Sequence, residues 1–208
     1  MNFLQLCQRL RQEVGGSGSG PSTVLSQNGE NRQYVDWINQ AWIEIQSMHS
    51  WHFLWTQGSV ELQPGALVHA LPDDLGVLDS ASMVIGGVRL PLVDYLAFRD
   101  AYRAAGVGRP VASTLLPNGQ LKLSAYPDQP YTLEFDYFIK PASLASNTEI
   151  PALPGQFHML IVYKAMQFYG TYENAPEVFR DGLMKYERML PDLENAALPP
   201  MSLPGAIA

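Results

Sequence analysis

Apolar residues recur with the spacing of an α-helix near the start of the chain. Over residues 2–14 they lie three or four positions apart, with Gln, Arg and Glu between them, as in an amphipathic helix. A second stripe of this kind runs from about Glu30 to His49. The segment between them, residues 15–21, is made of Gly and Ser with a final Pro. It is expected to be a flexible linker, with a finger that contacts a neighbouring subunit or another protein of the assembly as the alternative. No lysine follows it as a phosphate loop would require.

The helical spacing returns in the last quarter of the sequence. Residues 156–170 carry a third stripe, and a final helix is expected after Asn174, the predicted N-cap, with Glu177 as its capping-box partner. Pro191 is expected to end that helix, because proline lacks the backbone N–H that a helix interior needs. The four stripes predict a helix-bundle core formed by Phe3, Leu6, Leu10, Ile38, Trp42, Ile45, Phe157, Ile161, Phe168, Phe179 and Leu183.

Between Ser50 and Pro154 the pattern changes to short alternating runs broken by Gly, Pro, Asn and Asp, which is typical of antiparallel β-structure. The pairs Asn118-Gly119 and Gly86-Gly87 predict two tight hairpins. Residues 132–140 alternate most strictly and predict a strand with one buried face. One helix is expected inside this region, from an N-cap at Asp94 to Gly106.

The predicted fold is therefore α+β. The N- and C-terminal helices, residues 1–50 and 151–191, are expected to form an antiparallel helix bundle, and residues 51–150 a β-rich insert. Residues 192–208 are apolar, proline-rich and almost uncharged after position 194, so they are expected to form an extended arm that docks on a partner.

Composition narrows the class of protein. The chain has 208 residues, 13 Lys+Arg against 20 Asp+Glu, and a net charge of −7, which argues against a basic nucleic-acid binder. Only 16% of its residues are charged while 47% are hydrophobic, so much of its surface is expected to be covered by partners. No apolar run is long enough to span a membrane and no secretory signal is recognisable, so synthesis in the cytoplasm is expected.

No group of residues forms a convincing catalytic or metal site. His49 and His52 could face one metal ion from a helix, but no further ligand completes the shell. Asp73-Asp74 follows a proline and is expected to be a turn. Cys7 lies on the apolar stripe and is expected to be buried. We therefore expect no enzymatic activity, no cofactor and no metal.

All four tryptophans fall between residues 37 and 55, together with Tyr34 and Phe53. Aromatic platforms for single-stranded nucleic acid need interleaved positive charge, and no Lys or Arg occurs between Tyr34 and Trp55. An aromatic core at the end of the second helix is the favoured interpretation.

Three segments carry a likeness to a known family, in the same order along the chain. They are residues 2–13, residues 35–42 with the exit Trp51-x-Phe53-Leu54-Trp55, and Phe157-His158-x-x-Ile161-Val162 followed by Gly170-x-Tyr172-Glu173. Together they resemble the head-to-tail adaptor (connector) proteins of tailed bacteriophages.

The resemblance implies a structural virion protein at the head-tail junction. Such adaptors assemble as a homo-oligomeric ring, commonly a dodecamer, beneath the portal protein. The ring extends the channel for the genomic DNA, which passes without sequence-specific binding, and carries the tail or nozzle proteins below. On this hypothesis the portal-docking arm uses Leu198, Pro199, Pro200, Met201, Leu203, Pro204 and Ile207.

Two other interpretations stay open at this stage. The chain could be a different virion ring, such as a tail terminator or stopper, which differs in position rather than in physical properties. It could also be a hydrolase accessory or ligand-binding domain, although no spaced pair of acids supports that class.

Overall fold

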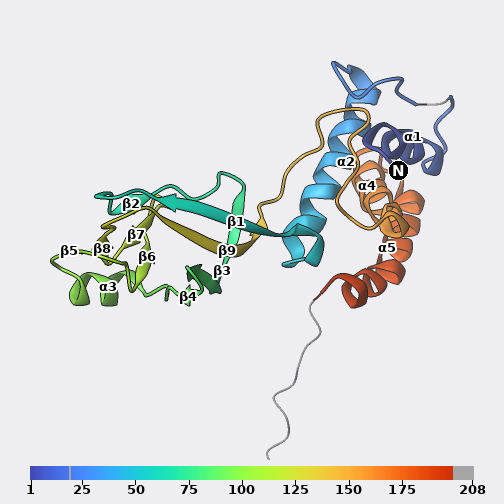
Figure 1. The fold of residues 1–208 in the computed structure, drawn as a ribbon. Helices are drawn as coiled ribbons and strands as arrows, with labels where there is room; N and C mark the ends of the chain where they lie inside the picture. The colour runs from blue at the N-terminus through green and yellow to red at the C-terminus, as the bar shows by residue number, and fades with distance from the viewer. Residues whose placement is uncertain (19, 199–208) are drawn as a thin grey trace, which may run out of the picture. The chain divides into compact units, whose positions relative to one another are not determined.

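The computed structural model describes residues 1–18 and 20–198. Five α-helices and several mainly antiparallel sheets occur in this part of the chain, which confirms the α+β class (Figure 1). The described chain divides into two compact units. We call Trp55–Lys140 the β unit and the remainder the helical unit.

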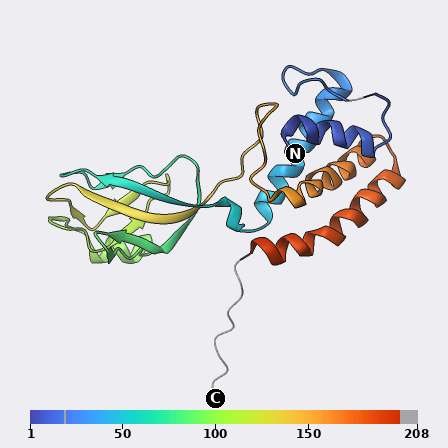
Figure 2. The ribbon, with the colours of Figure 1, turned by 45° about the vertical axis from the view of Figure 1, so that its right-hand side comes forward.

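The helical unit has α4 as its central element, since α4 packs against α1, α2 and α5 (Figure 2). Its helices are α1 (Phe3–Glu13), α2 (Gly29–Met48), α4 (Met159–Tyr172) and α5 (Pro176–Ala197), with short 3-10 turns η1 (His52–Leu54) and η2 (Gly155–Phe157). Asn2 caps α1 through a capping box, because its side chain accepts from the Gln5 N–H and the Gln5 side chain accepts from the Asn2 N–H, both at 2.9 Å.

The start of α5 differs from the prediction. Asn174 is not its N-cap, since Ala175 occupies that position and no side chain caps the helix. Instead Asn174 has φ +52° and ends α4, and the Ala175 N–H donates to the Gly170 carbonyl at 2.8 Å. This is a Schellman arrangement, in which the left-handed residue cannot also cap the next helix.

The end of α5 also differs. The helix continues through Pro191 to Ala197, so residues 192–197 are helical and not part of an extended arm. A proline inside a helix costs about 3 kcal/mol. Burial of Leu193 and Ala197, which are 0% and 3% exposed, offsets that cost because a fully buried leucine contributes about 1.5–3 kcal/mol.

Most of the residues expected in the helical core are buried, namely Phe3, Leu6, Leu10, Ile38, Trp42, Ile45, Phe157 and Ile161. Phe168 and Leu183 are half-buried. Phe179 is 37% exposed and is a correction to the expected core. Its backbone lies directly over Gly170, where an added Cβ would come within 2.6 Å of the Phe179 nitrogen, so this close backbone approach leaves the ring partly outside.

A segment without regular secondary structure, residues 141–150, is held against α2 by two side-chain amides. Asn39 accepts from the Leu144 N–H at 2.8 Å and donates to its carbonyl at 3.1 Å. Gln46 likewise accepts from the Ala142 N–H at 3.2 Å and donates to the Ala142 carbonyl at 2.9 Å. Each amide replaces the pair of hydrogen bonds that a neighbouring strand would supply.

The β unit is built on a four-stranded sheet of order β1-β9-β3-β4. Its strands are β1 (Trp55–Leu62), β9 (Tyr131–Ile139), β3 (Leu75–Ile85) and β4 (Val88–Arg89), all paired antiparallel. A second sheet of order β2-β7-β6 contributes Leu121 and Leu123 to a core that also contains Leu133, Phe135 and Tyr137. Its strands are β2 (Val68–His69), β7 (Leu121–Leu123) and β6 (Ser113–Leu115).

Both predicted hairpins are present, but the one at Asn118-Gly119 is not a two-residue turn, because residues 116–120 separate its strands and Asn118 does not have a positive φ. Gly86 and Gly87, with φ +52° and +75°, join β3 to β4, and Gly119, with φ +79°, lies in the turn between β6 and β7. The helix α3 (Tyr95–Ala101) has the expected cap at Asp94, whose carboxylate accepts from the Leu96 N–H at 2.9 Å.

Two details of the β unit differ from the prediction. Helix α3 ends five residues before Gly106, because Gly106 belongs to β5 (Gly106–Val107). This strand pairs parallel with β8 (Ala125–Tyr126), so the region is not antiparallel throughout.

Candidate functional site

The outer face of the β1-β9-β3 sheet carries carboxylates. Leu133, Phe135 and Tyr137 of β9 point into the core, so Glu134 and Asp136 between them point outward. Residues paired across strands share a face. Asp136 lies opposite Asp79 of β3, and Glu61 of β1 lies opposite Thr132, whose hydroxyl donates to the Glu61 carboxylate at 2.8 Å.

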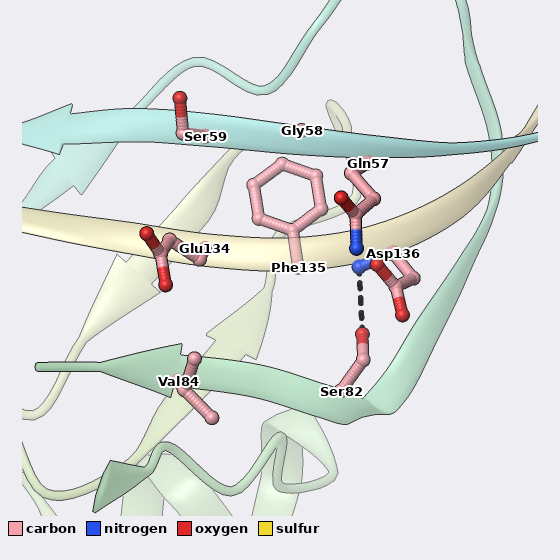
Figure 3. A pocket seen from close by; sticks show the side chains of 8 residues that line it. All are labelled: Gln57, Gly58, Ser59, Ser82, Val84, Glu134, Phe135 and Asp136. Carbon is pink, nitrogen blue, oxygen red and sulfur yellow. Dashed lines mark hydrogen bonds between the residues drawn. The ribbon is translucent and has the colours of Figure 1, made fainter. Parts of the chain in front are cut away.

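This face contains a shallow pocket of about 450 Å³, shown in Figure 3. Gln57 and Ser59 border it from β1, Glu134 and Asp136 from β9, and Ser82 and Val84 from β3. No lysine or arginine lines it. Its surface is therefore polar and negatively charged.

An irregularity in β3 forms one wall of this pocket. The pairing of β3 with β9 shifts register between Asp79 and Val84, as in a β-bulge. The Ser82 hydroxyl fills the break, because it accepts from the Asp136 N–H at 2.7 Å and donates to the Asp79 carbonyl at 2.8 Å. The bulge thereby keeps the Asp136 backbone paired.

A glycine allows the core rings to lie against β1. An added Cβ at Gly58 would come within 2.9 Å of the Tyr137 ring and 3.1 Å of the Phe135 ring. Figure 3 shows the Phe135 ring reaching from β9 toward β1 at this position. The rings cover the backbone there, as aromatic side chains do over glycines in sheets.

Two arginines lie beside β4, the edge strand of the same sheet opposite to β1. Arg89 of β4 and Arg109 border a notch of about 260 Å³ whose walls include Val88 and the buried Leu90. Arg109 donates to the Ile85 carbonyl. Within Trp55–Lys140, all of which the structure describes, the ion pairs are those of Arg99 and Arg103 with Asp100. Arg89 and Arg109 thus have no carboxylate partner in this unit.

The histidine pair weighed as a metal site is not brought together with further ligands. His49 lies 3.3 Å from the Glu194 carboxylate and packs its ring on Trp51, while His52 is exposed. No group of three or more His, Cys, Asp or Glu suited to a metal ion occurs among residues 1–18 and 20–198.

Asp73 and Asp74 lie in a turn, as predicted. The Tyr137 hydroxyl donates to the Asp74 carboxylate at 3.0 Å. Burial and this neighbouring negative charge raise the pKa of Tyr137. Asp74 therefore has a structural partner on β9.

Cys7 is fully buried on α1, as predicted. Burial raises the pKa of its thiol to about 12 because the thiolate would lose its hydration. The side chain behaves as a small apolar core residue.

The aromatic cluster at the end of α2 is confirmed for three of its members. The rings of Trp51 and Phe53 stack with their centroids 5.6 Å apart, and those of Phe53 and Trp42 with their centroids 6.1 Å apart. The Trp51 indole N–H donates to the Ile45 carbonyl at 2.6 Å. Trp55 is not part of this core, since it begins β1 and is 46% exposed.

Of the docking-arm residues, only Leu198 lies in the described part of the chain. It ends α5 in an extended conformation, and its N–H donates to the Glu194 carbonyl at 3.0 Å. Pro199, Pro200, Met201, Leu203, Pro204 and Ile207 lie outside the described residues.

Sequence reasoning missed the amide clamps of Asn39 and Gln46 and the notch beside Arg89. A polar residue on an apolar stripe, such as Gln46 next to Ile45, was the available signal for the clamps. The notch is formed by residues 85–90 and 109–111, which are distant in sequence, so no local pattern predicts it.

A family model described as SU10 adaptor protein matches residues 1–204. The chain belongs to the SU10 adaptor protein family. This agrees with the resemblance to phage head-to-tail adaptors and makes the chain a structural adaptor protein of a phage. No curated protein matches the adaptor. None of the helices described in the adaptor is both long and apolar enough to cross a membrane.

Proposed function

We propose that this adaptor assembles as a homo-oligomeric ring, a dodecamer, beneath the portal protein of the filled capsid. In this position the ring extends the DNA channel and carries the tail or nozzle proteins below. The observation that carries the proposal is the family match over nearly the whole chain. The adaptor's role is structural, and we assign it no enzymatic step.

The outer sheet face supports the channel part of the proposal. Glu134 and Asp136 border the pocket on this face, which no lysine or arginine lines, and Glu61 and Asp79 lie on the same face outside it. A wall of carboxylates repels the phosphate backbone, so DNA slides past it without being held. The net charge of −7 has the same sign as that face.

The portal contact is assigned to the residues that follow α5. Because the helix continues to Ala197, which is 3% exposed, the proposed arm begins at Leu198. A proline-rich segment loses little conformational entropy when it docks, and Met201, Leu203 and Ile207 are its apolar anchors.

The test is the mass of the purified adaptor, alone and mixed with portal rings of the same phage, by native mass spectrometry. We expect a portal–adaptor complex carrying twelve copies of the adaptor, and loss of that complex when residues 199–208 are deleted. Serine substitution of Met201, Leu203 and Ile207 keeps the arm length and is the matched control for the apolar anchors. Portal binding that survives both changes would refute the docking arm, and an adaptor that never joins the portal would refute the proposal.

A tail terminator or stopper is the alternative position for such a ring. Electron cryo-microscopy of the virion distinguishes them, because the proposed adaptor ring contacts the portal directly.

A further inference from the structure

We propose that neighbouring copies of the adaptor are joined through the β unit, with strand β1 of one copy adding to the β4 edge of the next. This inference rests on the proposed ring and names the surfaces that meet in it. The two surfaces are the opposite edges of the same four-stranded sheet.

Strand β1 is an open edge of the sheet. It pairs with β9 over eight consecutive residues without a bulge, and no strand lies on its other side in that sheet. Natural edge strands are blunted by lysine, proline, bulges or shortness. The sequence of β1, Trp55–Leu62, contains no lysine and no proline, and Glu61 is its one charged residue. Its free N–H and C=O groups are therefore available for another strand.

The opposite edge offers a short strand beside an apolar notch. Val88 and Arg89 form β4, and Val88 is 56% exposed. The notch of about 260 Å³ beside them has apolar walls and two arginines at its border. It is suited to a segment that brings both apolar side chains and a carboxylate.

Charge selects which edges meet. Glu61 lies on β1 and Glu134 on the adjacent strand, and neither has an ion pair within the β unit. Arg89 and Arg109 at the other edge likewise lack a carboxylate partner there. Pairing β1 with β4 of the next copy brings these opposite charges together. Pairing two β1 edges instead brings the Glu61 side chains of the two copies close to each other and leaves the arginines without a carboxylate partner.

The proposed contact is heterologous, since two different surfaces of the same chain meet. A heterologous contact generates a closed ring when its rotation closes. The acidic face of the sheet would then continue from copy to copy around the ring.

Cross-linking tests the contact in the full-length protein assembled on portal rings. The variant Val60→Cys with Val88→Cys places both thiols on the same face of the extended sheet, since Val60 is in register with Leu133, Leu133 with Ile85, and Ile85 with Val88. Treated with a short bismaleimide, it is expected to give a ladder of covalent multimers. Cys7 does not interfere, because it is fully buried. The matched control, Val60→Cys with Asn118→Cys in the β6–β7 turn, is expected to give no ladder.

A charge exchange tests the specificity. In the cross-linking background, Glu61→Arg or Arg89→Glu alone is expected to reduce the ladder by about tenfold, and both together to restore it to within about twofold. Thermal unfolding of each variant verifies that the β unit is intact, and Glu61→Gln provides a milder variant.

The outcomes separate the two proposals. A portal-bound ring of the expected mass that gives no ladder refutes the β1–β4 contact and leaves the proposed function standing. Dimers from Val60→Cys alone show a β1–β1 contact and also refute it. Failure of the unmodified adaptor to form a ring refutes the proposed function, and the contact with it.

Discussion

At the scale of single residues, polar side chains organise parts of the adaptor that apolar burial alone would leave undefined. Asn39 and Gln46 lie seven positions apart on α2, two helical turns, so both face the same side. Each forms two hydrogen bonds to the backbone of the 141–150 segment. That segment in turn accepts the Phe3 N–H at the Glu149 carbonyl, at 2.8 Å. Two amides thus link α2 to the start of α1.

Gln46→Leu is expected to destabilise the helical unit by about 1–3 kcal/mol, because it removes the two hydrogen bonds to Ala142, each of which contributes about 0.5–1.5 kcal/mol. Gln40→Leu is the matched control, since Gln40 is exposed on the same helix and its side chain donates a hydrogen bond to the Glu44 carboxylate. Urea unfolding followed by far-ultraviolet circular dichroism measures both. Equal stability of the two variants would contradict the role of the clamp.

At the scale of elements, the contact between α4 and α5 depends on two glycines. An added Cβ at Gly170 would lie 2.6 Å from the Phe179 nitrogen, and one at Gly182 would lie 2.9 Å from the Tyr163 carbonyl oxygen. Backbone atoms cannot rotate away as side chains can. The two helices therefore approach as closely as they do only because neither glycine has a side chain.

Gly170→Ala is expected to destabilise the helical unit by about 1–3 kcal/mol, the cost of overpacking. Helix propensity favours alanine by about 1 kcal/mol, but the overlap with a neighbouring backbone is the larger effect. Gly155→Ala, where nothing lies within 4 Å, is expected to be neutral. Thermal denaturation of the two variants compares them, and a stabilised Gly170→Ala protein would show that the helices separate freely.

The sequence predicted the elements well where one local pattern determined them. The strict alternation over residues 132–140 identified both the buried and the outward face of β9. Prediction from the sequence failed where one residue could belong to either of two elements, as with Asn174, which ends α4 instead of starting α5. It also failed at Pro191, where burial of Leu193 outweighed a local signal. The opposite charges of the two sheet edges required the strand order, which no local pattern contains.

At the scale of the whole molecule, we propose that the two compact units are separate domains. The β unit, Trp55–Lys140, lies within the insert expected at 51–150. The difference arises because Trp51 and Phe53 pack with α2, and because the segment after Pro141 is bound by the α2 amides. Each unit has its own buried core.

Separate domains are expected to respond separately to core substitutions. Leu133→Ala should destabilise the β unit, and Ile161→Ala the helical unit, each by about 2–5 kcal/mol. Both side chains are fully buried. In differential scanning calorimetry each substitution is expected to shift a different transition. A single transition that moves equally in both variants would show one cooperative unit.

The chain enters the β unit at Trp55 and leaves it after Lys140. The strands at these two ends, β1 and β9, are paired neighbours with Trp55 opposite Phe138. The two junctions are thus close together, which is the geometry that tolerates domain insertion. Recombination between phages can therefore exchange the β unit, residues 55–140, as a single segment. The helical unit would need only two adjacent attachment points to accept a different β module.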